Sequence, residues 1–179
     1  LADNLDGRRL PIKESERRQG MYPYYGASGI IDWVESYILD GDYVLLGEDG
    51  ENVVSRNLPL AFRVTGKYWV NNHAHIYEAK LGVDIRFLVE VLEAKDYGPW
   101  VSGSAQPKLT QHALARIRFQ RPPTHEQQSI ADRLESLASR LSSERSELMR
   151  LHALKSGLMD DLLTGRVRVT PLLAQPAGT

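Results

Sequence analysis

The sequence predicts an α+β fold, in which a mixed globular domain with short strands is followed by a single long coiled-coil-forming helix. Residues 1–122 contain short apolar runs separated by glycine-containing turns, which is typical of strands. After Pro122 and Pro123 no proline occurs before Pro171, and apolar residues recur at helical spacing. We therefore expect a domain at 1–122, a long helix at 123–164, and a short C-terminal strand and tail at 165–179.

Runs rich in β-branched and aromatic residues predict the strands of the first domain. These runs are Ile30–Val34, Tyr43–Leu46, Leu60–Val64, Tyr68–Val70 and Ala115–Phe119. Glycine pairs with a polar residue at three places where the chain is expected to turn: Gly41-Asp42, Asp49-Gly50 and Gly66-Lys67. The strands are short and irregularly spaced, so the sequence predicts a mixed arrangement without an internal repeat.

One amphipathic helix is expected within the first domain, beginning after Asp84. Aspartate is a favoured N-cap because its carboxylate accepts a hydrogen bond from the first turn of a helix. The apolar residues Ile85, Leu88, Val89 and Leu92 follow at three- and four-residue spacing, which places them on one face. We expect this face to be buried.

The long helix is predicted to run from about residue 125 to residue 163. Thr124 and Gln127 fit a capping box, in which each side chain bonds to the backbone N–H of the other residue. Gly165 suits the stop at the C-terminal end. The four residues Arg166–Val169 then alternate between charged and apolar, which predicts a short strand.

Apolar residues of the long helix alternate between four- and three-residue spacing, which is the pattern of a coiled coil. The positions of this seam are Ile130, Leu134, Leu137, Leu141, Leu148, Leu151, Leu158 and Leu162, and the charged residues Glu144 and Lys155 interrupt it. So narrow a seam with charged flanks predicts pairing with another helix; the alternative is a helix that lies on its own domain. Polar seam positions can fix register, and antiparallel helices could bring the acid and the base together.

Composition and charge restrict the function classes. The 22 basic and 23 acidic residues give a net charge of -1, whereas a sequence-independent DNA-binding protein normally has a basic excess. The absence of cysteine excludes disulfides, thiolate metal sites and cysteine nucleophiles. No apolar stretch is long enough to span a membrane, so a cytoplasmic protein without a membrane partner is expected.

Motifs of catalysis are missing from the sequence. It contains neither of the glycine-rich phosphate-binding loops, GxxxxGK[ST] and GxGxxG, nor the GxSxG motif of a hydrolase. His73 and His75, with Glu48 and Asp49, are the best candidates for a metal site. Without a third spaced ligand, they are more typical of hydrogen-bonded strand and turn residues. We therefore expect no catalytic residue, no metal and no cofactor.

Polar residues suited to contact DNA bases and phosphates occur at several predicted turns and loops. The candidates are Arg56, Lys67, Gln106 and Lys108, followed by Tyr25 and Ser102. Each of them, taken singly, is also typical of an ordinary solvated loop or, for Tyr25, of a core.

Six segments carry a resemblance to a known family: residues 22–32 (YPYYGASGIID), 43–50 (YVLLGEDG), 72–75 (NHAH), 103–109 (GSAQPKL), 122–131 and 162–165 (LLTG). In this order they resemble the specificity subunits of type I restriction-modification enzymes. Such a subunit contains two copies of a module, each with a target-recognition domain and a long helix. The present chain corresponds to one module, from a full subunit or from a half-subunit that dimerises.

The resemblance implies a sequence-specific DNA-binding module that reads half of a split double-stranded target. The helix would pair antiparallel with that of a second module or a second copy, and would dock methylase subunits, through which the restriction subunit joins. No residue of the module would be catalytic, because methyl transfer and cleavage belong to those partners. Three alternatives stay open: an assembly module that does not read DNA, which the net charge favours, the recognition domain of a fused type II enzyme, and, third, an enzyme in its own right.

Overall fold

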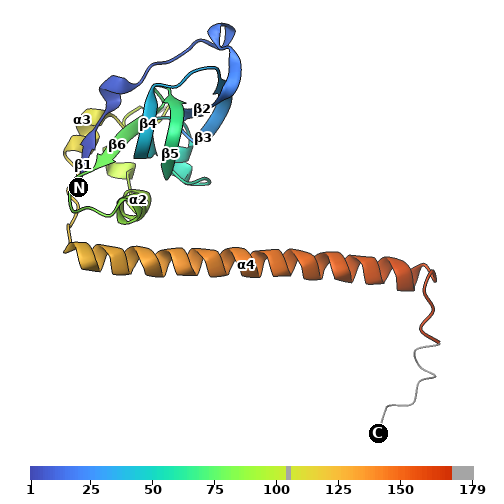
Figure 1. The fold of residues 1–179 in the computed structure, drawn as a ribbon. Coiled ribbons are helices and arrows are strands. Elements are labelled where there is room, and N and C mark those ends of the chain that lie inside the picture. The colour runs from blue at the N-terminus through green and yellow to red at the C-terminus, as the bar shows by residue number, and fades with distance from the viewer. Residues whose placement is uncertain (104–105, 171–179) are drawn as a thin grey trace. The chain divides into compact units, whose positions relative to one another are not determined.

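The computed structural model describes residues 1–103 and 106–170, and a six-stranded sheet lies at the centre of its globular part (Figure 1). In spatial order the strands are β1 (Ala2–Asn4), β6 (Ala74–Ala79), β4 (Leu39–Gly47), β5 (Ala61–Val70), β2 (Gln19–Gly26) and β3 (Gly29–Val34). Neighbouring strands pair antiparallel, except for β2 and β5, which run parallel. The sheet is therefore mixed, as the α+β prediction requires.

The helices of the described residues are α1 (Asn52–Ser55), α2 (Ile85–Glu93), α3 (Gln111–Ala115) and α4 (Thr124–Leu163). Three short 3-10 turns, Asp6–Arg8, Glu14–Glu16 and Gly98–Trp100, lie in the connections. No helix in the described part of the chain is long and apolar enough to cross a membrane.

Strand β4 lies at the middle of the core, because both faces of the sheet are covered there. Successive side chains of a strand point to opposite faces. Val44 and Leu46 belong to one buried cluster, and Tyr43 and Leu45 to another. The apolar run that predicted this strand is therefore that of a strand buried on both sides.

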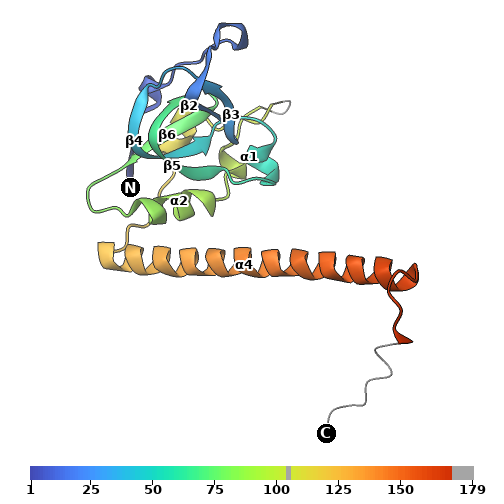
Figure 2. The ribbon, with the colours of Figure 1, turned by 45° about the vertical axis from the view of Figure 1, so that its right-hand side comes forward.

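Helix α2 covers one of these faces and confirms its sequence prediction (Figure 2). The Asp84 carboxylate accepts the backbone N–H of Arg86 at 2.8 Å, so Asp84 is the N-cap. Leu88 and Leu92 are buried in the cluster that contains Val44. The three- and four-residue spacing thus identified a core-facing stripe.

Two of the predicted turns are wrong. Gly66-Lys67 does not separate two strands, because Leu60–Val64 and Tyr68–Val70 fall almost entirely within β5. Gly41-Asp42 lies inside β4, where Gly41 faces Gly66 in the register. Gly66 has a φ of +81°, which only glycine adopts without strain, so this glycine keeps the long strand continuous. The turn after Asp49 is confirmed, with Gly50 at a φ of +92°.

The predicted strand Ala115–Phe119 is also wrong. Its first residue ends α3, and the following residues are neither helix nor strand. The Thr110 hydroxyl accepts the backbone N–H of Ala113 and so begins a helix here. Ile117 is buried all the same. The apolar residues of this run therefore indicate burial and not strand pairing.

Helix α4 confirms the predicted long helix, but its N-terminus is not a capping box. The Gln127 side chain is fully buried, accepts the backbone N–H of Asp84 at 3.0 Å, and donates to the carbonyls of Gly82 and Pro122. The Thr124 hydroxyl donates to the Gly82 carbonyl at 3.0 Å. Both side chains bind a segment distant in sequence, which local spacing cannot reveal.

Replacing Gln127 with alanine should lower the free energy of unfolding by about 1–3 kcal/mol, because it leaves buried backbone groups without partners. The shift in the denaturant midpoint measures this loss. Gln128 is the matched control, since it is exposed and one position along the same helix. An alanine there should change stability by less than about 0.5 kcal/mol. Equal effects of the two variants would contradict the bonding described above.

The end of α4 is partly as predicted. Gly165 has a φ of +73° and its N–H bonds to the carbonyl of Leu162, so it ends the helix. The predicted strand Arg166–Val169 is wrong, because these residues form bends and coil. The rest of the predicted tail, residues 171–179, lies outside the described residues.

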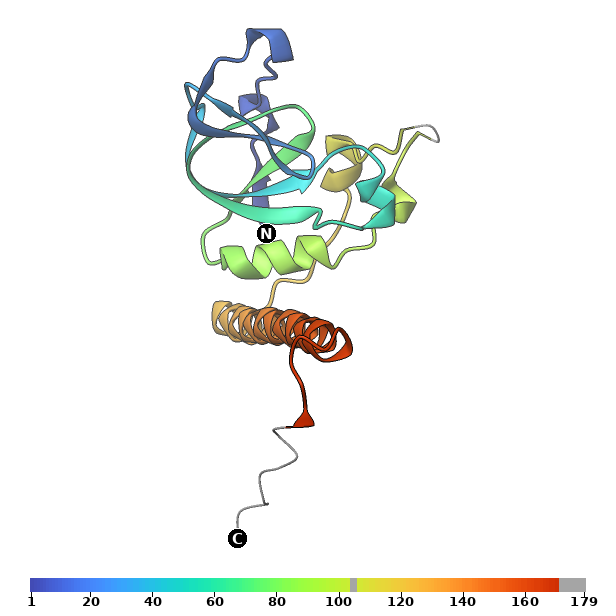
Figure 3. The ribbon, with the colours of Figure 1, turned by 90° about the vertical axis from the view of Figure 1, so that its right-hand side faces the viewer.

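The chain forms two compact units, Leu1–Ala131 and the residues from Asp132 onward. Gln127 and Ala131 are the buried residues of α4. The first two turns of α4 therefore pack as part of the globular unit, beyond the boundary at 122/123 that the sequence predicts. From Asp132 the helix continues without a break to Leu163, and Figure 3 views it nearly along its axis.

Candidate functional site

A buried polar cluster joins four distant segments of the globular unit around His75 of β6. The His75 ring is fully buried. Its Nδ1 lies 2.6 Å from a carboxylate oxygen of Asp6, and its Nε2 lies 2.7 Å from the backbone carbonyl of Leu109. The other oxygen of Asp6 accepts the backbone N–H of Ile76 at 3.0 Å. Segments around residues 6, 75 and 109 are thereby tied together.

Both partners of the His75 ring are hydrogen-bond acceptors. A carboxylate and a carbonyl can each receive a proton but cannot donate one. Only the imidazolium form has N–H groups on both nitrogens, so the geometry fits a positively charged His75. The Asp6 carboxylate then neutralises this charge inside the protein.

Glu48, at the end of β4, is the second acid of the cluster. Its carboxylate binds Arg9 through one oxygen and the Lys108 ammonium through the other, at 3.0 Å. Arg9 also lies 3.4 Å from Asp6 and donates to the carbonyl of Ala74. The acid is therefore held between two cations, as a buried carboxylate must be.

The charges of this cluster lower the pKa of its two carboxyl groups, Asp6 and Glu48. Burial by itself raises the pKa of Asp6, but the hydrogen bond and the charge of His75, with the Ile76 N–H, bring that pKa below its ordinary value. Burial likewise opposes the shift at Glu48, whose pKa is lowered by hydrogen bonds from Arg9 and Lys108. Both acids are thus ionised at neutral pH.

The cluster anchors the loop that follows Ser102. Ser102 and Lys108 exchange two backbone hydrogen bonds of 2.9 and 2.8 Å, which close the loop at its base. The N–H of Leu109 then bonds to the Glu48 carbonyl at 2.7 Å, and the N–H of Gly50 bonds to the Pro107 carbonyl at 3.1 Å. Polar residues between these anchors are presented on a fixed base.

The two histidines expected as metal candidates bind different carboxylates. His73 is exposed and its Nδ1 lies 2.8 Å from Asp49, whereas His75 is buried against Asp6. Glu48 is held by Arg9 and Lys108. Within residues 1–103 and 106–170, no group of three or more histidine and acidic residues is suited to hold a metal ion.

Three of the six DNA-contact candidates lie on the anchored loop. Ser102 and Gln106 are exposed, and so is Lys108 apart from its ion pair with Glu48. The hydroxyl of Ser102 donates to the carbonyl of Lys108 at 3.3 Å. Ser104 and Ala105, which belong to the same loop, lie outside the described residues.

The other three candidates lie elsewhere in the globular unit. Arg56, just after α1 with a φ of +54°, binds the carboxylate of Glu93 at 2.9 Å. Tyr25 packs edge-on against Tyr68, and burial raises the pKa of its hydroxyl. These contacts give Arg56 and Tyr25 structural roles besides any contact with DNA.

Lys67 is exposed on β5, with its ammonium 4.8 Å from the centre of the Tyr37 ring. In the strand register it faces Asp40 of β4, whereas Lys108 pairs with Glu48 beyond the other end of that strand. At about 3.3 Å per residue, the two lysines are separated by roughly 25 Å along the sheet. The six candidates therefore do not form one patch.

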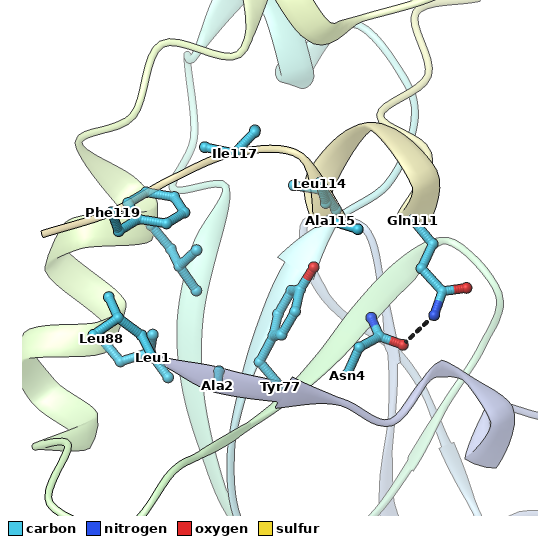
Figure 4. Close-up of a pocket in the computed structure, with 11 residues that line it drawn as sticks. Leu1, Ala2, Asn4, Tyr77, Leu88, Gln111, Leu114, Ala115, Ile117 and Phe119 are labelled. Carbon is cyan, nitrogen blue, oxygen red and sulfur yellow. Dashed lines mark hydrogen bonds between the residues drawn. The ribbon is translucent and has the colours of Figure 1, made fainter. Parts of the chain in front are cut away.

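A separate cavity of about 280 Å³ lies between β1, α2 and α3 (Figure 4). Its walls are mostly apolar, and Asn4, Tyr77 and Gln111 contribute polar groups. Burial raises the pKa of Tyr77 to about 12, so this hydroxyl stays protonated at neutral pH. None of the six candidate residues lines the cavity.

Asp6, Arg9 and Gln127 are the residues whose roles the sequence did not reveal. Asp6 and His75 are 69 positions apart, and Arg9 and Glu48 are 39 apart. No local spacing marks such pairs. Three of the segments that carry the resemblance, residues 43–50, 72–75 and 103–109, meet in this cluster, but Asp6 and Arg9 lie in none of the six segments.

The comparisons with known proteins agree on one family. Residues 3–151 match the family model of the type I restriction modification DNA specificity domain. A putative type I restriction enzyme specificity subunit of Haemophilus influenzae is 37% identical over 144 residues, which is 80% of this chain and 37% of that protein. The specificity subunit of the type I restriction enzyme EcoprrI of Escherichia coli is 26% identical over 134 residues, 73% of this chain and 32% of that protein.

Solved structures show the same fold. The S subunit of a type I restriction-modification system from M. genitalium aligns over 90% of this chain and 45% of its own, with a TM-score of 0.59 and 11% identity. A chain from a structure of a type I R-M system aligns over 90% of this chain and 43% of its own, with a TM-score of 0.62 and 14% identity. The present chain thus spans about a third of the curated relatives and under half of the solved ones.

Proposed function

The chain belongs to the type I restriction modification DNA specificity domain family, and from this premise we propose that it reads one half of a split double-stranded DNA target. In this proposal it is a non-catalytic specificity module. Methylase subunits bind to it and carry out the chemistry, and the restriction subunit joins through them.

The anchored loop of residues 102–109 is the observation that supports DNA reading best. Binding residues commonly occur on loops that a rigid scaffold positions. Here the buried cluster of Asp6, His75 and Glu48 is the scaffold, and Ser102, Gln106 and Lys108 are the side chains presented. Glutamine can pair with adenine through two hydrogen bonds, while lysine binds phosphates or guanine. We therefore rank these three above Arg56, Lys67 and Tyr25.

Replacing Lys108 with alanine should weaken binding to all DNA sequences alike and reduce the salt slope of log K by about 1, because one phosphate contact is lost. Fluorescence anisotropy with labelled duplexes at several salt concentrations measures both quantities. Lys80 is the control, since it is also exposed and ion-paired, but follows the other end of β6. An unchanged slope in the Lys108 variant would remove this residue from the interface.

Sequence specificity is tested by methylome sequencing of cells that express the chain with a matching methylase subunit and, if needed, a second recognition module. The proposal expects a new split motif in which one half changes when the anchored loop is exchanged. The second candidate function is an assembly module that does not read DNA, which the net charge of -1 favours. Complex formation without any sequence-specific methylation would support that alternative.

The seam of α4 is the proposed assembly surface. From Leu134 to Leu162 its leucines are exposed along the second unit. An exposed apolar stripe on a helix is typical of a surface that another helix or protein covers. We assign it to pairing with another helix and to docking of the methylase subunits.

A further inference from the structure

We propose that Arg116 and Arg118 bind phosphate groups of the DNA backbone beside the bases that the loop at residues 102–109 contacts. Neither arginine belongs to the six candidates chosen from the sequence. This role rests on the proposed function and names further residues of the same DNA-binding surface. Three features support it: the distribution of charge along the chain, the exposure of the two side chains, and their place beside the loop.

Acidic residues are absent from one long stretch of the sequence. Residues 97–125 contain Lys108, Arg116, Arg118 and Arg121 but no aspartate or glutamate, although the whole chain has 23 acidic residues. A cluster of positive charge without neighbouring acids is typical of a surface that binds nucleic-acid phosphates. The net charge of -1 therefore hides an uneven distribution, in which this stretch is basic and the rest of the chain has an excess of acids.

Arg116 and Arg118 are both exposed, and neither is paired with an acid. Among residues 1–103 and 106–170, neither guanidinium takes part in an ion pair or a hydrogen bond. Most of the other lysines and arginines in the described globular unit form ion pairs, such as Lys108 with Glu48. The donors of Arg116 and Arg118 can therefore bind a ligand without breaking an existing bond.

Buried neighbours hold the segment that carries the two arginines. Ile117 is buried and Phe119 is partly buried against the core cluster that contains Leu88, and both line the cavity in Figure 4. Arg116 precedes Ile117, and Arg118 lies between the two apolar residues. The segment that the sequence predicted as a strand thus presents two cations to solvent from a fixed position.

Arg116 also lies close to the base of the loop at residues 102–109. Its guanidinium is 5.9 Å from the centre of the Trp100 ring. Trp100 precedes Ser102 by two residues, which corresponds to at most about 7 Å of extended backbone. Contact with an aromatic face restricts a guanidinium but leaves its N–H groups able to bind an anion. A duplex whose bases reach the loop has its backbone at the edges of the contacted groove, so cations beside the loop suit its phosphates.

The guanidinium group matches the chemistry of a phosphate. It carries five N–H donors in a fixed fork, binds phosphate through two parallel hydrogen bonds, and stays charged at physiological pH. Phosphate contacts position a protein on DNA but carry no sequence information. Arg116 and Arg118 should therefore strengthen binding to every duplex alike, while the loop selects bases.

The variant R116Q/R118Q tests this role by fluorescence anisotropy of the 179-residue chain with a labelled duplex at several salt concentrations. The slope of log K against log salt should decrease by about 2, because two phosphate contacts are lost. Affinity at about 0.1 M salt should fall at least about tenfold. R116K/R118K should keep most of the slope, since lysine retains the charge. An unchanged slope in R116Q/R118Q overturns the inference.

The double variant K13Q/R18Q is the matched control, because it removes the same net charge. Lys13 and Arg18 are exposed, but they form ion pairs with Glu16 and Glu35. Both precede β2, which lies toward the opposite edge of the sheet from β1. The salt slope of this control should stay close to that of the wild type. Equal decreases in the two double variants would reflect net charge alone and would contradict a local contact.

Methylome sequencing and co-purification separate DNA from an acidic protein surface as the ligand. Cells that express R116Q/R118Q with the methylase subunit should methylate the same split motif as the wild type, at fewer of its sites. A motif with altered bases would assign the arginines to base reading. Loss of the methylase subunit on co-purification, with the salt slope unchanged, would assign them to that protein. Either result overturns the phosphate role.

Failure of the proposed function has a different signature. If the wild type gives no split motif but R116Q/R118Q still lowers the salt slope, the chain does not read DNA and the phosphate contacts stand. If the wild type gives a split motif and R116Q/R118Q leaves the salt slope unchanged, DNA reading stands and the phosphate role of the two arginines is wrong.

Discussion

Replacing His75 with leucine is expected to lower the free energy of unfolding by about 3 kcal/mol or more, because it leaves the buried Asp6 carboxylate without its main partner. It also removes the bond to the Leu109 carbonyl, and with it one anchor of the loop at residues 102–109. The loss is measured by denaturant unfolding of both proteins at pH 7.

His73 is the matched control, because it lies two residues away and also binds a carboxylate, but is exposed. Leucine at position 73 should change stability by less than about 1 kcal/mol, since exposed pairs contribute little. The double variant H75L/D6N completes the cycle. If the loss of stability in H75L/D6N equals the sum of the losses in H75L and D6N, the two residues are not coupled and the hydrogen bond between them does not contribute as described.

Lowering the pH should reduce the difference in the free energy of unfolding between the wild type and the variant D6N. The pKa of Asp6 is lower in the folded chain than its ordinary value of 3.8, and that of Glu48 is lower than 4.5. A lowered carboxyl pKa contributes stability that is complete above the unfolded value and is lost as the pH falls through the folded one. The free energy of unfolding, measured from pH 7 to pH 3, should therefore depend less steeply on pH in D6N than in the wild type.

Replacing Glu93 with alanine is the second change with a large expected effect, about 2–4 kcal/mol, because charged-group hydrogen bonds contribute the most. One oxygen of this carboxylate accepts the backbone N–H groups of Leu60 and Ala61, both at 2.8 Å. The other lies 2.9 Å from Arg56. A single side chain of α2 thus holds the start of β5 and the turn after α1.

The variant Glu93→Gln separates these contributions. Glutamine keeps an acceptor oxygen for the backbone groups but loses the charge that binds Arg56, so it should lose less stability than alanine. Thermal unfolding of the three proteins side by side gives the comparison. If glutamine is as destabilising as alanine, the ion pair with Arg56 carries the effect. Arg56 would in that case hold the fold, and its place among the DNA-contact candidates would weaken.

The elements that the sequence predicted well are those determined by local pattern. Helix α4 follows from its seam and the glycine at its end, and α2 follows from Asp84 and its apolar face. The pairing of β2 with β5 could not be predicted, because it joins segments over forty residues apart and its polar and aromatic run has no alternation. Gly66 was misread for a related reason, since a glycine predicts a turn unless the strand beside it is known.

The site was predictable only in part. Ser102, Gln106 and Lys108 are adjacent in sequence, so a loop could be expected from composition. The buried partners of that loop could not, because Asp6 and His75 are brought together by the sheet. Arg56 and Tyr25 were chosen for chemical type alone, and the structure gives both of them intramolecular contacts.

Backbone hydrogen bonds hold the loop at residues 102–109 at both of its ends. Its base is closed by Ser102 and Lys108, and its exit is held by Leu109. The described residues between these anchors, Gly103, Gln106 and Pro107, belong to no strand of the sheet. A segment closed in this way can be exchanged as a cassette, with a different length or sequence, at a modest entropic cost. A library built there would test whether this loop sets the DNA preference that we propose for the chain.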